Sequence, residues 1–139
     1  MMDTGGCEFA APYLREEKTM DSIIVNMEDL EPDGNGYDFE GYLYGGANVS
    51  IIFVDMEPGK GPRLHRHPYE EVFIIQEGEA TYTVGDKVIE AKAGQIVVGP
   101  AGVPHKFVNS GTGRLKQVDI HVNDRFVTEW LEDQEFETI

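Results

Sequence analysis

Three histidines and one glutamate stand in two short segments and could together bind a metal ion. His65, His67 and Glu71 lie in the first segment, and His105 lies in the second. Side chains on a strand alternate between its two faces, so His65 and His67 point in one direction. Glu71 has the same parity and joins them if the chain stays extended past Pro68. His105 opens a later strand and supplies a fourth ligand if that strand lies beside the first.

Three neutral imidazoles and one carboxylate suit one divalent transition metal ion. Fe, Mn, Ni, Co, Cu and Zn all accept these ligands, and the ligand types alone do not choose among them. Four protein ligands on an octahedral ion leave open positions for a substrate, water or dioxygen. A closed thiolate cluster is excluded because the chain contains one cysteine, Cys7. Since the metal needs neutral imidazole, binding is expected to weaken below a pH of about 6.5.

Short strands must position these residues. The chain has 139 residues, of which 16 are Gly and 7 are Pro. The Gly and Pro lie between short apolar runs, a pattern typical of strands joined by turns. The sequence therefore predicts one all-β domain, a sandwich or barrel. The expected strands cover residues 22–27, 37–44, 49–57, 70–76, 79–84, 87–91, 95–98, 105–109 and 114–122.

The two ends of the chain differ from this strand-rich centre. Residues 1–20 show no periodicity and are expected to form an arm, so the barrel covers 21–123. Asn123-Asp124 could cap a helix, and the apolar residues that follow recur at helical spacing. They are Phe126, Val127, Trp130 and Leu131. The sequence thus predicts a short C-terminal helix packed on the barrel and a solvated acidic tail, together spanning 124–139.

The formal net charge of −15 limits the kinds of partner. Such a surface repels phosphate backbones and anionic lipid, so we expect neither nucleic-acid nor membrane partners. The sequence shows no signal peptide and no apolar run long enough to span a membrane. We therefore expect a cytoplasmic protein.

Residues 59–78 and 94–109 resemble the two motifs of the cupin superfamily. The first motif, G(X)5HXH(X)3,4E(X)6G, is matched by Gly59, His65, His67, Glu71 and Gly78. The second, G(X)5PXG(X)2H(X)3N, is matched by Gly94, Pro100, Gly102, His105 and Asn109. The spacer between the motifs, residues 79–93, has a length typical of small single-domain cupins. All specified positions match, which makes the resemblance far more specific than a lone HXH pair.

The resemblance implies a cupin double-stranded β-helix, also called a jelly-roll barrel, with His65, His67, Glu71 and His105 as its metal ligands. It also implies action on a small organic molecule, as in dioxygenases, isomerases or decarboxylases. The alternative is a non-enzymatic protein that uses the metal to bind a small molecule. A storage role is disfavoured because seed-storage cupins normally have two domains. A regulator fused to a DNA-binding domain is not expected for this chain.

Side chains that share the parity of the ligands are expected to line a pocket beside the metal, although ordinary core packing is an equal alternative. Phe73 and Ile75 share the parity of Glu71, and Phe107 shares that of His105. Tyr82, which could donate a hydrogen bond to a ligand, and Gln117 complete the predicted pocket. On strand 114–122, the stripe of Gln117, Asp119 and His121 faces either the cavity or solvent. If it faces the cavity, His121 can act as a general base, so Glu71 and His121 are the candidate catalytic residues.

Val72 and Ile74 lie on the opposite face of their strand and are also apolar. Apolar residues on both faces require a second covering layer. This layer could be the N-terminal segment, the C-terminal helix or a partner subunit. A homodimer packed sheet to sheet is the expected arrangement, with a small-molecule ligand as the other partner.

Overall fold

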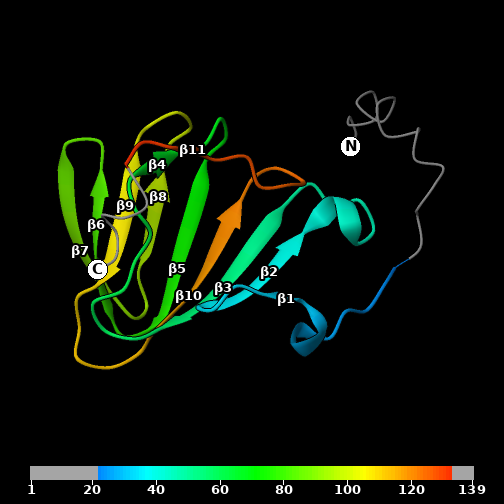
Figure 1. Ribbon diagram of the computed structural model, residues 1–139, viewed down its shortest axis with the longest axis horizontal. Coiled ribbons are helices and arrows are strands. Elements are labelled where there is room, and N and C mark those ends of the chain that lie inside the picture. The colour runs from blue at the N-terminus through cyan, green and yellow to red at the C-terminus, as the bar shows by residue number, and fades with distance from the viewer. Residues whose placement is uncertain (1–21, 133–139) are drawn as a thin grey trace, which may run out of the picture.

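The computed structural model describes residues 22–132 and shows two antiparallel sheets that face each other (Figure 1). The predicted arm and most of the predicted acidic tail lie outside these residues. The six-stranded sheet runs in the order β1 (Glu31–Pro32), β2 (Gly36–Glu40), β3 (Ser50–Met56), β10 (Leu115–His121), β5 (Glu71–Glu77), β8 (Ile96–Gly99). The five-stranded sheet runs β11 (Glu129–Trp130), β4 (His65–Arg66), β9 (His105–Asn109), β6 (Glu79–Val84), β7 (Lys87–Lys92). The prediction of an all-β barrel is confirmed.

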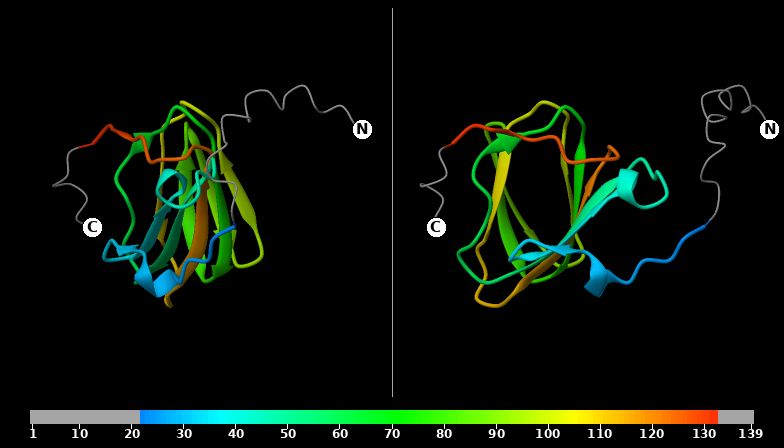
Figure 2. Two further views of the ribbon diagram at one scale, coloured as in Figure 1. Left: turned by 90° about the vertical axis from the view of Figure 1, so that its right-hand side faces the viewer. Right: turned by 45° about the vertical axis from the view of Figure 1, so that its right-hand side comes forward.

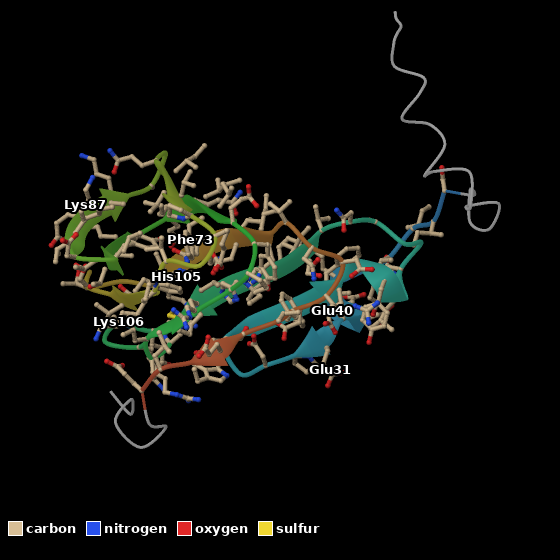
Figure 3. All side chains as sticks on the ribbon, turned by 90° about the horizontal axis from the view of Figure 1, so that it is seen from above. Glu31, Glu40, Phe73, Lys87, His105 and Lys106 are labelled. Carbon is tan, nitrogen blue, oxygen red and sulfur yellow. The ribbon has the colours of Figure 1, made fainter. Side chains whose placement is uncertain are left out.

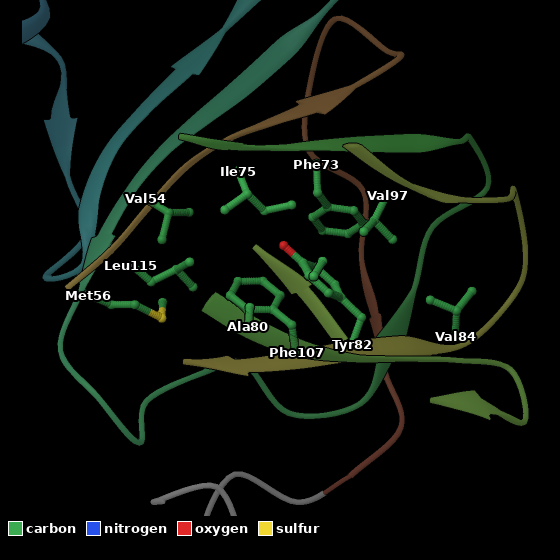
Figure 4. Packing of buried hydrophobic residues seen from close by; sticks show 11 residues of the cluster. Val54, Met56, Phe73, Ile75, Ala80, Tyr82, Val84, Val97, Phe107 and Leu115 are labelled. Carbon is green, nitrogen blue, oxygen red and sulfur yellow. The ribbon is translucent and has the colours of Figure 1, made fainter. Parts of the chain in front are cut away.

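The core lies between the two sheets, because each long strand turns alternate side chains inward (Figure 4). Phe73 of β5 packs against Tyr82 of β6 and Phe107 of β9, with ring centroids 5.1 and 5.9 Å away. Aliphatic residues fill the rest of the space between the two sheets. They are Val54, Met56, Ile75, Ala80, Val97 and Leu115. This packing supports the strands that carry the histidines.

Of the two strands predicted near the N-terminus, the one over 22–27 is wrong and the one over 37–44 is wrong in part. Residues 22–26 form no strand, and a 3-10 helix, η2 (Met27–Asp29), follows them. The strand expected over 37–44 ends at Glu40 and gives way to the 3-10 helix η3 (Gly41–Leu43). The turn needs glycine at position 41, because a Cβ there would lie 1.8 Å from the carbonyl oxygen of Ala47. Only glycine permits this close approach of two backbone segments.

The predicted C-terminal helix is wrong for the residues that the structure describes. Residues 123–132, here called the strap, contain no helix and cross one end of the barrel in an extended conformation (Figure 2). Their peptide groups bond to distant partners instead of to one another. Phe126 N donates to Glu40 Oε2, and Leu131 N donates to the Leu64 carbonyl. These tertiary hydrogen bonds outweigh a helical spacing of apolar residues, since helix propensity is a weak preference.

Within residues 22–132, no helix has the length and apolar character needed to cross a bilayer.

Candidate metal centre

The four predicted ligands come together at the end of the barrel that the strap crosses. One ligand atom from each of His65, His67, Glu71 and His105 lies within 4.8 Å of every other, and all four side chains are buried. The ring of His105 lies inside the barrel, with its centroid 5.5 Å from that of Phe73 (Figure 3). The sequence motifs therefore correspond to one compact cluster.

Strand pairing brings the two segments together. β4 pairs with β9 in a register that places His65 opposite His105. Glu71 is the first residue of β5 and lies opposite Gly99 of β8. A Cβ at position 99 would lie 3.3 Å from Nδ1 of His105, so the missing side chain leaves room for that ring. Glu71 reaches the cluster even though the chain bends between His67 and β5 instead of staying extended.

Backbone carbonyls orient the three histidines of the cluster. Nδ1 of His65, His67 and His105 each faces a carbonyl oxygen, and a carbonyl can only accept a hydrogen bond. These oxygens belong to Arg63 at 2.7 Å, Val127 at 2.9 Å and Val103 at 3.3 Å, in that order. A proton on Nδ1 leaves the Nε2 lone pair free, which is the arrangement that metal-binding histidines require.

The Nε2 atoms converge on the Glu71 carboxylate. Those of His67 and His105 both lie 3.0 Å from Glu71 Oε1. Nε2 of His67 is buried and makes no hydrogen bond there, because its geometry does not fit one. Nε2 of His105 can donate to Glu71 only in the tautomer whose proton is on Nε2 instead of Nδ1, and a bound cation would take the place of that proton. Buried lone pairs without donors around a carboxylate fit a divalent metal ion.

Burial and contacts within the cluster shift the pKa values of His65 and Glu71. Burial lowers the pKa of His65 to about 4, and its neighbours His105 and His67 add to the effect. For Glu71, burial alone would raise the pKa, but the close contacts with His105, His121 and His67 hold it well below the usual range. A neutral His65 and an ionised Glu71 are the forms that bind metal.

The polar stripe of β10 points into the barrel, so the alternative in which it faces solvent is wrong. Gln117, Asp119 and His121 are 1–3% exposed. Nε2 of His121 lies 3.0 Å from Glu71 Oε2, on the oxygen that the other histidines do not contact. His121 thus adjoins the cluster, which places one predicted catalytic side chain beside the other.

The hydrogen-bond partner of His121 differs from those of the other three histidines, because it is the hydroxyl of Tyr69 and not a backbone carbonyl. The Tyr69 hydroxyl accepts from Val127 N at 3.1 Å and lies 2.8 Å from Nδ1 of His121. Its own hydrogen can be donated to that nitrogen, which leaves the imidazole proton on Nε2, facing Glu71. The sequence prediction missed Tyr69, although residue 69 shares the parity of His65, His67 and Glu71.

The predicted pocket residues are buried, but most of them pack against one another. Phe73, Ile75 and Tyr82 belong to the core, and the Tyr82 hydroxyl donates to Oε1 of Gln117. Phe107 is the one of the five that also lines a cavity of about 180 Å³. This cavity, which is lined by residues of β3, β9, β10 and the turn between β1 and β2, is called the side cavity below.

Comparisons with known proteins agree with this architecture. Residues 52–121 match the family model described as Cupin domain. An uncharacterized protein of Methanocaldococcus jannaschii is 32% identical over 106 residues, which cover 76% of this chain and 74% of that protein. The HTH-type transcriptional regulator PuuR of Escherichia coli (strain K12) is 28% identical over 109 residues, or 75% of this chain. The match spans 58% of the regulator's own length.

Among solved structures, the Bacillus subtilis oxalate decarboxylase studied for its Mn(II) centres superimposes with a TM-score of 0.68 and 23% identity. The superposition covers 76% of this chain and 30% of the decarboxylase, and at this identity it shows a shared fold alone. The family match over residues 52–121, about half of the chain, shows that the chain belongs to the cupin family, and the two facing sheets agree with it.

Proposed function

We propose that this cupin binds one divalent transition metal ion through His65, His67, Glu71 and His105 and acts with it on a small organic molecule. The observation that carries the proposal is the orientation of the histidines, whose Nδ1 atoms face carbonyls while their Nε2 atoms converge on Glu71. Fe, Mn, Ni, Co, Cu and Zn all suit these ligands. Mn(II) in the decarboxylase of the same fold supports a divalent ion.

The reaction types that fit are those of dioxygenases, isomerases and decarboxylases. When bound, the ion would supply Lewis-acid or redox chemistry. Glu71 and His121 would supply proton transfer, since His121 Nε2 lies 3.0 Å from Glu71 Oε2 and can hold a proton there. Tyr69 fixes which nitrogen of His121 carries that proton, and the strap, through Val127, holds Tyr69 in place.

Turnover by the loaded protein tests the proposal. The protein, loaded with each metal in turn, would be assayed with diphenols, diketones and thiols, and oxygen consumption would be followed. We expect turnover that requires the metal, and we expect His121→Gln to lower kcat by about 100-fold while the metal stays bound. Tyr69→Phe, which keeps the ring but removes the hydroxyl, should shift the pH profile of kcat. Full activity of His121→Gln would exclude His121 from proton transfer.

A second candidate function is metal-dependent binding of a small molecule without turnover. Two observations favour it: the likeness to a transcriptional regulator, and the low exposure of the cluster, 2–7% for its four side chains. Stoichiometric metal and saturable ligand binding without product would support this candidate over an enzyme. The absence of nucleic-acid and membrane partners and a cytoplasmic location stay predictions from the sequence.

We further propose that the protein is a homodimer whose subunits meet through the outer face of the six-stranded sheet. Apolar side chains stand there in two rows across five neighbouring strands. The first row is Tyr37, Phe53, Val118, Ile74 and Ile96; the second is Phe39, Ile51, Ile120, Val72 and Val98. Ile96 and Val98 are 61% and 54% exposed. These rows carry no charge, so a second copy can cover them despite the net charge of −15.

A lysine at the centre of this face is expected to separate the subunits. Ile74→Lys places a charge that would be buried without a partner, so the dissociation constant should rise by about 100-fold or more. Sedimentation velocity at one protein concentration would give the mass of each species. Val88→Lys is the matched control, because Val88 is 67% exposed on the other sheet. A monomeric wild-type protein, or a dimeric Ile74→Lys variant, would contradict the proposed interface.

A further inference from the structure

The side cavity lies one residue layer below the metal cluster and has a different character. Asp119 precedes His121 by two residues on β10, and Phe107 follows His105 by two residues on β9. Both line the cavity, together with Ile52, Val54, Met56 and Pro62. The walls are therefore mainly apolar, and none of the four proposed metal ligands is among the residues that line it.

Asp119 is the buried polar group of the cavity. Its side chain is 2% exposed, and Gln117 Nε2, at 2.8 Å from Oδ1, is its one hydrogen-bond donor within residues 22–132. Burial raises the pKa of Asp119 well above its usual range, and the charge of Glu71 raises it further, so a cation bound beside Asp119 would favour its ionised form. A buried carboxyl group with one neutral donor gains more from a cation than from any other ligand.

The mouth of the cavity is acidic as well. Asp33 and Asn35, from the turn between β1 and β2, line its more exposed side. Asn35 N donates to Asp33 Oδ1 at 2.8 Å, which holds that carboxylate in place. No lysine or arginine occurs among the residues that line the cavity. The field of these carboxylates attracts cations and repels anions.

We propose that the side cavity binds a small organic ammonium ion, with its nitrogen at Asp119 and its alkyl part against the apolar walls. A metal cation does not fit, because it needs several oxygen ligands and the inner walls offer few. A carboxylate ligand does not fit, because it would meet Asp33 and Asp119. A volume of about 180 Å³ admits a chain of a few carbons. The aromatic ring of Phe107 adds a surface that favours cations.

This site shares no residue with the proposed metal site, so it can be tested without metal. The full chain, first metal-free and then metal-loaded, would be titrated calorimetrically with butylammonium. Butyramide serves as a neutral probe of similar size, and butanoate as an anionic one. We expect saturable one-to-one binding of butylammonium, at least about tenfold weaker binding of butyramide, and no binding of butanoate. Equal affinity for butyramide and butylammonium would overturn the proposal, as would the absence of saturable butylammonium binding.

Two variants test the role of the cavity residues. Asp119→Asn keeps the shape and the contact with Gln117 but removes the charge, and it should weaken butylammonium binding by at least about tenfold. Asp86→Asn removes the same charge from the exposed turn between β6 and β7 and should leave binding unchanged. Val54→Leu keeps Asp119 and narrows the cavity, so it should weaken butylammonium more than methylammonium. If Asp119→Asn does not fold, the result for Val54→Leu alone tests whether butylammonium binds in the side cavity. Unchanged affinity in a folded Asp119→Asn variant would contradict the assignment.

Discussion

Replacement of His65 by alanine is expected to abolish stoichiometric metal binding. The substitution removes an Nε2 donor that the Arg63 carbonyl orients from 2.7 Å away on the other side of the ring. Loss of a residue that only orients a ligand typically lowers metal affinity by about 10- to 100-fold, so loss of the ligand itself should cost more than about 100-fold. Elemental analysis after dialysis and competition with a chelating dye would measure the metal content and the affinity.

His121→Gln is the matched control for this experiment. It also removes a buried imidazole whose Nε2 lies 3.0 Å from Glu71. The Tyr69 hydroxyl, unlike a carbonyl, can donate to Nδ1 of His121, so that ring is not expected to be a ligand. We therefore expect this variant to keep its metal with an affinity within about tenfold of the wild type. Equal metal loss in both variants would show that His121 belongs to the ligand set, and full metal content in His65→Ala would refute the proposed site.

Acidification of the metal-free protein is expected to lower its free energy of unfolding, because the buried His65 is protonated less readily in the folded chain than in the unfolded chain. Its pKa is about 4 in the folded chain, against an ordinary value of 6.5. Between these values the unfolded chain binds a proton that the folded chain does not, so stability is lost as the pH falls. The stabilisation from a neutral His65 is complete above pH 6.5 and is lost as the pH falls to about 4. The loss is about 3 kcal/mol, on the order of 1.4 kcal/mol for each pH unit.

Other buried groups act in the opposite direction, so the measurement must isolate His65. Burial and the hydrogen bond with Asp33 raise the pKa of Asp38 to about 7, and that of Asp119 is also raised. These carboxyl groups stabilise the fold most at low pH and less as the pH rises. Urea denaturation of the wild type and His65→Asn at several pH values would cancel their contribution. We expect the stability difference between the two proteins to change by about 3 kcal/mol from pH 7 to pH 4. A constant difference would contradict a neutral, buried His65.

The lowered pKa of His65 also lowers the pH at which metal release is expected. The ordinary pKa of histidine places the weakening of metal binding below a pH of about 6.5. In the folded protein a proton must compete for His65 at a nitrogen whose pKa is about 4. Retention of metal at pH values between these two would therefore agree with the buried site.

Local patterns in the sequence were enough to predict most of the strands and the grouping of two of the proposed ligands. Alternation along a strand places residues two apart on one face, so the grouping of His65 with His67 follows from parity. Glu71 begins a strand of the other sheet after a bend, so parity alone did not bring it to the cluster. The Gly85-Asp86 pair predicts the turn between β6 and β7, and the structure has a hairpin there with a positive φ of 63° at Gly85. These features depend on neighbours within a few residues, so the sequence alone determined them.

Tertiary structure decided what the same patterns left open. Parity grouped Gln117, Asp119 and His121 on one face, but only the packing of the six-stranded sheet against the five-stranded sheet made that face the inner one. The pairing of His65 with His105 depends on strands about forty residues apart. The strap is extended because its peptide groups bond to Glu40, Leu64 and Tyr69, all distant in the sequence. Which face is buried, and which distant group satisfies a peptide, are properties of the whole fold.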